Sequence, residues 1–136
     1  MRMTMEIVEA DVTISGADPS TEVAISLDEY SGIIHRIKVI RTASDGTAYD
    51  TNSRTFELLE STGATSEGID SIVKFDDLEP DGTSGYLVNH EQGYTFKNND
   101  NPNEKKIYAK MTASGGDETS TETYKVRIYY EPIGRR

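Results

Sequence analysis

The feature that most constrains the fold of this chain is a strict alternation of apolar and polar residues between positions 121 and 131, TETYKVRIYYE. The residues of one parity are apolar or aromatic: Tyr124, Val126, Ile128 and Tyr130. Because successive side chains of a β-strand point to opposite faces, this pattern predicts a half-buried strand. β-Branched and aromatic residues also favour strands. Other strands must therefore cover the apolar face.

Further segments of the chain have strand character and are separated by clusters of Gly, Asp, Asn, Ser and Thr. No stretch of ten residues has the apolar spacing of an amphipathic helix. We therefore predict an all-β fold, an antiparallel β-sandwich of about eight strands that is jelly-roll-like, with an immunoglobulin-like sandwich as the alternative. The expected strands, besides the one at 121–131, are residues 3–15, 22–27, 32–41, 54–60, 69–75, 86–96 and 104–113.

The expected domain organisation is a single β-sandwich domain over residues 1–136. A chain of this length can bury roughly two-thirds of the surface that it exposes when unfolded, so one core is sufficient. Residues 1–14 are a candidate N-terminal arm, and residues 132–136 form a short basic C-terminal tail. Between residues 3 and 15 the apolar parity changes, which indicates a β-bulge, a strand that crosses between sheets, or two short strands.

The pattern also predicts how some strands are placed. In the segment GIIHRIKVIR, residues 32–41, we expect one face to consist of Ile33, His35, Ile37 and Val39. Because the opposite face of this segment also carries apolar residues, the strand is expected to lie centrally in a sheet. The two last strands, 104–113 and 121–131, are expected to form a hairpin.

The charge balance limits the partners of this chain. Its 136 residues include 14 Lys and Arg against 24 Asp and Glu, and the formal net charge of −10 opposes binding to nucleic acid or to anionic membranes. The absence of Cys excludes disulfides, thiol nucleophiles and Cys-based zinc sites. No apolar run is long enough to span a membrane, and we expect a soluble chain without a signal peptide. An acidic surface also suits a salt-rich environment, where screening weakens repulsion.

Few residues of this sequence point to chemistry. His35 and His90 are the two histidines, and neither lies in a motif that pairs it with a nucleophile or with metal ligands. We therefore expect no enzymatic activity, no catalytic residue and no cofactor. Three acidic segments, residues 44–50, 76–81 and 98–104, are interpreted as turns, with a structural cation such as calcium as the alternative.

A cluster of aromatic and basic residues indicates a protein interface. On the last strand Tyr129 takes the outward parity beside Lys125 and Arg127, and Tyr and Arg are enriched at interfaces. The alternative is a cross-strand pair that stabilises the sheet. Arg135 belongs to the basic tail, which either binds an acidic patch on a neighbour or is a frayed terminus. The predicted interface residues are Arg127, Tyr129 and Arg135.

Three segments, GIIHRIKVI, TFELLESTG and KVRIYYE, resemble in layout the small all-β virion structural proteins of tailed bacteriophages and haloarchaeal tailed viruses. The similarity spans most of residues 32–131. It implies a non-enzymatic capsid decoration or cement protein that binds the major capsid protein, or another virion protein, and stabilises the shell. It also implies a homo-oligomer, with a trimer favoured, and a place on the capsid surface after a soluble stage in the host cytoplasm. The resemblance carries over no active-site residue.

Two other classes of protein share these sequence features. A tail, baseplate or head–tail connector component has the same β-rich composition and differs in its partner and symmetry. A glycan-binding β-sandwich module requires exposed aromatic rings over a groove, and its candidates here are Tyr86 and Tyr94.

Overall fold

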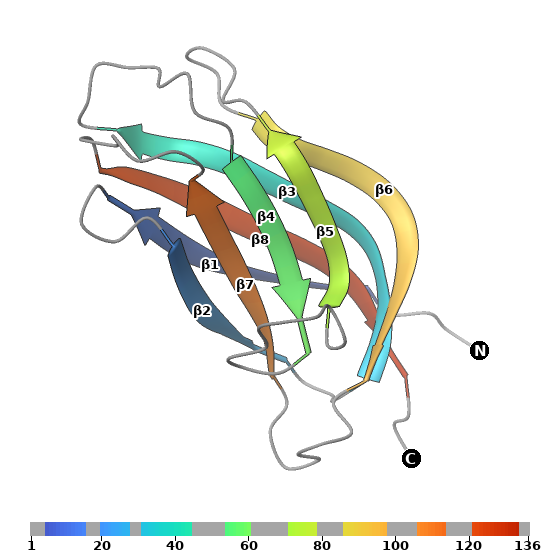
Figure 1. Ribbon diagram of the computed structural model, residues 1–136. Helices are drawn as coiled ribbons and strands as arrows, with labels where there is room; N and C mark the ends of the chain where they lie inside the picture. The colour runs from blue at the N-terminus through green and yellow to red at the C-terminus, as the bar shows by residue number, and fades with distance from the viewer. Residues whose placement is uncertain are drawn as a thin grey trace.

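The computed structural model describes residues 5–15, 20–27, 31–44, 54–60, 71–78, 86–97, 106–113 and 121–133. These residues form eight antiparallel strands in two four-stranded sheets that face each other (Figure 1). The predicted all-β antiparallel sandwich of about eight strands is therefore confirmed. The strands are β1 (Glu6–Ile14), β2 (Ser20–Ser26), β3 (Ser31–Ser44), β4 (Arg54–Leu59), β5 (Ser71–Leu78), β6 (Tyr86–Lys97), β7 (Lys106–Ala113) and β8 (Glu122–Pro132).

The strand order shows how the chain is wound. The first sheet has the order β1-β8-β3-β6, and the second sheet has the order β2-β7-β4-β5. Four antiparallel pairings nest one inside another, β1 with β8, β2 with β7, β3 with β6 and β4 with β5. This arrangement differs from the seven- or nine-strand immunoglobulin arrangements.

The predicted hairpin between the two last strands is wrong. β7 pairs with β2 and β4 in the second sheet, whereas β8 pairs with β1 and β3 in the first sheet. The two strands are neighbours in sequence but lie in opposite layers of the sandwich (Figure 1). Short-range spacing favoured a hairpin, but pairing between distant segments determined the sheets.

The core lies between the inner faces of the two sheets, and β8 contributes to it as its alternation predicts. Tyr124, Val126, Ile128 and Tyr130 are all fully buried, and β3 is a central strand between β8 and β6, as predicted. Burying a large apolar side chain contributes about 1.5–3 kcal/mol to folding, so one such strand can supply much of the stability of a small domain. From the second sheet, the core includes Phe56, Leu58, Ile107, Ala109 and Met111.

A bulge in β3 corrects the predicted face of that strand. Ile34 lies opposite Tyr130 and Arg36 lies opposite Tyr129, so His35 is an extra residue relative to β8. Because a bulge shifts the alternation by one position, Ile34 and Ile37 are both buried. Ile33 and His35, predicted to share a face with Ile37, are half-buried on the opposite face instead.

The β-bulge that the change of parity near the N-terminus indicated is absent from the part of β1 that the structure describes. β1 pairs with β8 in unbroken register, from Glu6 opposite Tyr130 to Ile14 opposite Glu122. Residues 6–14 of the candidate arm therefore belong to the first sheet. The apolar residues of the other parity, Met5 and Ile7, remain exposed on its outer face.

A buried ionic cluster joins the two sheets. Arg54 at the start of β4 donates to Oε1 of Glu122 at the start of β8, with Nη2 and Nε at 2.9 and 3.2 Å. The Tyr124 hydroxyl donates to the same oxygen at 2.7 Å, and Arg41 of β3 approaches the other carboxylate oxygen at 3.4 Å. Burial, and then the bond to Glu122, raises the pKa of Tyr124. Burial is the largest single effect on Arg54 and works to lower its pKa, but the combined interactions with Glu122 and Tyr124 raise the pKa.

Candidate protein interface

Two of the predicted interface residues, Arg127 and Tyr129, lie on the outer face of the first sheet, the face turned away from β2, β4, β5 and β7. Lys125, Arg127 and Tyr129 alternate with the buried residues of β8 and are half-exposed, as their parity predicts. On one side β1 places Ile7 opposite Tyr129 and Glu9 opposite Arg127. On the other side β3 contributes the neighbouring outer-face residues Arg36 and Lys38.

An acidic column on β1 meets a basic column on β8. The Arg127 Nε donates to Oε2 of Glu9 at 2.6 Å, and this hydrogen bond lowers the pKa of Glu9. Lys125 Nζ lies 3.7 Å from Glu9 and 3.6 Å from Asp11. Exposed ion pairs contribute little to stability individually, so these pairs mainly fix the positions of the side chains.

Tyr129 is held between two cations. Lys38 Nζ lies 5.5 Å from the centre of the Tyr129 ring, within the range of a cation–π contact. Because both cations favour the charged phenolate, Arg127 and, to a smaller extent, Lys38 lower the pKa of Tyr129. The result is an ordered aromatic side chain with a basic border, a combination typical of interface residues that contribute strongly to binding.

The structure brings together two of the three predicted interface residues. Arg127 and Tyr129 are adjacent on the outer face, whereas Arg135 lies outside the described residues. Ile7 is a residue that the sequence prediction missed. Its side chain is 56% exposed, and its position opposite Tyr129 adds an apolar part to the same surface. The signal that could have identified it was the pair of apolar residues on the outward parity of β1.

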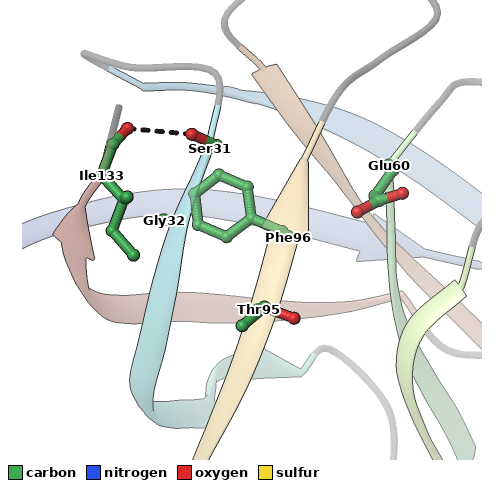
Figure 2. Close-up of a pocket in the computed structure, with 6 residues that line it drawn as sticks. All are labelled: Ser31, Gly32, Glu60, Thr95, Phe96 and Ile133. Carbon is green, nitrogen blue, oxygen red and sulfur yellow. Dashed lines mark hydrogen bonds between the residues drawn. The ribbon is translucent and has the colours of Figure 1, made fainter. Parts of the chain in front are cut away.

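A pocket of about 320 Å³ opens where β3 begins and β6 and β8 end (Figure 2). The Ser31 hydroxyl donates to the backbone carbonyl of Ile133 at 2.8 Å and ties the two strand ends together. Phe96 is 3% exposed and packs edge-to-face against Tyr130, so its ring is not presented for stacking by a ligand. The pocket is lined by Ser31, Gly32, Glu60, Thr95, Phe96 and Ile133.

Tyr94 is the one aromatic candidate for glycan binding whose side chain the structure describes. Tyr94 is half-buried, and its hydroxyl lies 2.8 Å from Nε2 of His90. The His90 ring also packs against Phe75 of the second sheet, with 5.0 Å between ring centres. The side chain of Tyr86 lies outside the described part of the chain.

The remaining candidates for chemistry have local structural partners. His35 Nε2 lies 3.1 Å from Oε1 of Glu131, on the outer face, and His90 bonds to Tyr94. Among the residues that the structure describes, no group of three or more His, Asp or Glu is placed to hold a metal ion. Residues 98–104 lie outside those residues, as does all of 44–50 except Ser44. Asp76, Asp77 and Leu78 of the segment 76–81 are described, and they form the end of β5 instead of the predicted turn.

Comparison with known proteins gives no relative from which a function could be transferred. Neither a protein-family model nor a curated protein matches the chain. Within the described ranges, no helix is long and apolar enough to cross a membrane. The arrangement of the outer face therefore carries the functional inference.

Proposed function

We propose that this chain is a non-enzymatic structural protein of a tailed virus, a capsid decoration protein that binds the major capsid protein through the outer face of its first sheet. The observation that supports this proposal is the placement of Tyr129 between Arg127 and Lys38, with exposed Ile7 opposite it. The resemblance of the strand layout to virion structural proteins gives the class of partner.

The chemistry of the outer face suits contact with another protein. A tyrosine ring supplies a large contact area at little cost in conformational entropy, and Arg127 and Lys38 already restrict the ring. The charges around it are paired, Arg127 with Glu9 and Arg36 with Glu91. On a chain of net charge −10, this balanced face is where another acidic protein would meet the least repulsion.

The proposed mechanism is stabilisation of an assembled shell. A subunit that binds the assembled shell but not its dissociated parts shifts the equilibrium toward the shell, by about 2.7 kcal/mol per site at a concentration one hundred times Kd. Two or more linked copies on the capsid surface would present several such outer faces and add their contacts.

Co-sedimentation with tailed-virus capsid shells that lack their decoration protein tests the proposal. The wild-type chain should sediment with a shell of this kind and raise its melting temperature. Tyr129→Ala should weaken binding about thirtyfold, the effect of losing an interface residue worth about 2 kcal/mol. Thr95→Ala changes an exposed residue of the same sheet on the opposite edge strand and should bind within about twofold of wild type.

Three outcomes would contradict the proposal. A chain that sediments with none of the shells would exclude the capsid role, and equal binding by Tyr129→Ala and wild type would exclude the outer face as the contact. A six-membered ring formed by the chain alone would indicate a tail or connector component instead.

A further inference from the structure

The four edge strands of the sandwich differ in how regularly they pair. β5 and β6 lie at the edges on one side, and both show register shifts against their neighbours. Asp77 of β5 also has a positive φ of 58°. β1 and β2 lie at the edges on the other side, and both pair in unbroken register. Because bulges bend an edge strand and hinder pairing with another chain, β1 and β2 are the edges without this protection.

Charge protects the edge of β1 only at Glu6, which lies opposite buried Tyr130 and therefore points inward. The sequence of β1, EIVEADVTI, contains no Lys, Arg, Pro or Gly. The two carboxylates on its outer face, Glu9 and Asp11, are turned toward β8, where Arg127 and Lys125 bind them. They are therefore not free to project over the edge and repel an approaching strand.

Exposed apolar residues distinguish β1 from β2. Met5 and Ile7 are 48% and 56% exposed and are two of the three large apolar side chains that are exposed in the described residues. Ile133 is the third, and it follows β8. β2 is shorter, with seven residues against nine, and none of these three belongs to it.

We propose that the free edge of β1 pairs antiparallel with β1 of a second copy of this chain, about a two-fold axis at Ile7. In this register Ile7 lies opposite Ile7 of the second copy, and both side chains leave water. Glu9 then lies opposite Met5, and Glu6 lies opposite Val8. The two first sheets become one continuous sheet of eight strands.

The acidic residues of β1 and its exposed isoleucine together select this register, because an axis at Val12 also avoids acid pairs but leaves Ile7 beyond the paired part of the strand. In an antiparallel pair, two residues directly opposite share a face and their Cβ atoms are only about 4.5–5.5 Å apart, so like charges there are destabilising. Two-fold axes at Glu6, Glu9 or Asp11 place each of these acids opposite its own copy, and an axis at Ala10 places Glu9 opposite Asp11. An axis at Val8 avoids acid pairs but places Ile7 opposite Glu9. The axis at Ile7 alone avoids acid pairs and pairs the exposed isoleucines.

Single-cysteine variants test the contact directly, because the chain has no Cys of its own. Ile7→Cys should form a disulfide-linked dimer rapidly under mild oxidation, since opposite Cβ atoms lie near disulfide distance. Thr95→Cys, also exposed on the first sheet but on the edge strand β6, should form little disulfide-linked dimer. For the register, an equimolar mixture of Met5→Cys and Glu9→Cys should give the mixed dimer. A preferential link between Ile7→Cys and Glu9→Cys would overturn the axis at Ile7.

Light scattering on the unmodified chain gives an independent measurement. Wild type should have twice the mass of one chain, and Ile7→Lys should have the mass of one chain with an unchanged circular dichroism spectrum, because Ile7 lies outside the core. Thr95→Lys should keep the mass of wild type.

A monomeric wild type, or equal crosslinking rates for Ile7→Cys and Thr95→Cys, would overturn the proposal. It does not rest on the capsid role, because a Tyr129→Ala variant that loses shell binding can still form the β1 pair. A mass of three chains would support the trimer implied by the resemblance and exclude the two-fold pair.

Discussion

Arg54 and Glu122 form an ion pair at the interface of the two sheets, with 2.9 Å between Nη2 and Oε1, although neither side chain is exposed to solvent. The pair links the start of β4 to the start of β8, two strands that lie in different sheets. Removing two charges from water is costly, so an intact buried pair contributes little net stability. Removing one partner leaves the other charge buried without compensation.

Glu122→Gln should therefore lower the free energy of unfolding by about 3–5 kcal/mol, because Arg54 loses its counter-charge. Urea unfolding followed by circular dichroism measures this difference. Glu91→Gln is the matched control, since Glu91 pairs with Arg36 on the exposed outer face, and it should cost no more than about 1 kcal/mol. Equal costs for the two variants would contradict this prediction, because they would show that buried Arg54 needs its counter-charge no more than exposed Arg36 does.

The double variant Arg54→Met with Glu122→Leu should recover most of the stability that Glu122→Gln loses. Apolar side chains of similar volume can replace a buried ion pair at little cost, because Arg54 is removed together with its counter-charge. Tyr124 and Arg41 lose their contacts with the Glu122 carboxylate in this variant. The same urea measurement applies. A double variant that is less stable than Glu122→Gln would indicate that Tyr124 and Arg41 depend on the carboxylate for their own positions.

Gly32 in β3 is fixed by the close approach of a neighbouring strand and a ring. A Cβ atom there would lie 2.6 Å from the backbone oxygen of Glu131 and 3.0 Å from the Phe96 ring. Gly32→Ala should cost about 1–3 kcal/mol, because β8 must shift to admit the methyl group. Thermal and urea unfolding both measure the loss.

Gly93 in β6 is the matched control for Gly32. A Cβ atom there would meet only Cγ2 of Ile33 within 4 Å, at 3.8 Å, an ordinary contact. Gly93→Ala should be neutral or stabilise by about 0.4–1 kcal/mol through the lower entropy of the unfolded chain. If Gly32→Ala proved as stable as Gly93→Ala, the packing at the start of β3 would be looser than the structure shows.

The contact between Glu9 and Arg127 predicts that the stability of the chain depends on pH. The hydrogen bond with Arg127 lowers the pKa of Glu9 below the ordinary value of 4.5. The stabilisation is therefore complete above that ordinary value and is lost as the pH falls through the lowered pKa. Glu9→Gln should be less stable than wild type at neutral pH, and the difference should shrink in acid. In an Arg127→Gln background, Glu9→Gln should no longer cause this pH-dependent loss of stability. If the stability difference between Glu9→Gln and wild type were the same at acidic and neutral pH, the assignment to Glu9 would be wrong.

The tyrosines should titrate in a defined order. Arg127 and Lys38 lower the pKa of Tyr129 from 10.0, whereas burial and Glu122 raise the pKa of Tyr124. In an absorbance titration of the eight tyrosines, Tyr129→Phe should remove an early step and Tyr124→Phe a late one. Because folded Tyr124 keeps its proton after the unfolded chain loses it, Tyr124 should reduce stability as the pH rises above 10.0. If either variant instead lost a step with the ordinary pKa of tyrosine, this order would be wrong.

Local pattern was sufficient to predict the fold class and the buried face of several strands. The alternation in β8 identified Tyr124, Val126, Ile128 and Tyr130 as core residues, and all four are buried. It also placed Tyr129 and Arg127 on the outer face. These predictions succeed because side-chain direction in a regular strand depends only on position within that strand.

Bulges, sheet membership and the partners of buried charges depend on the neighbouring strand and became visible only in the folded chain. The bulge at His35 reversed part of the face predicted for β3, and β7 and β8 proved to lie in different sheets. Arg54 and Glu122 are charged and 68 residues apart in the sequence, yet both are buried, because the pairing of the sheets brings their opposite charges together. Alternation within each segment was enough to predict most of the strands and the buried face of the regular ones. Only pairing between distant segments determined sheet order, bulges and the partners of buried charges, because these are properties of two strands and not of one.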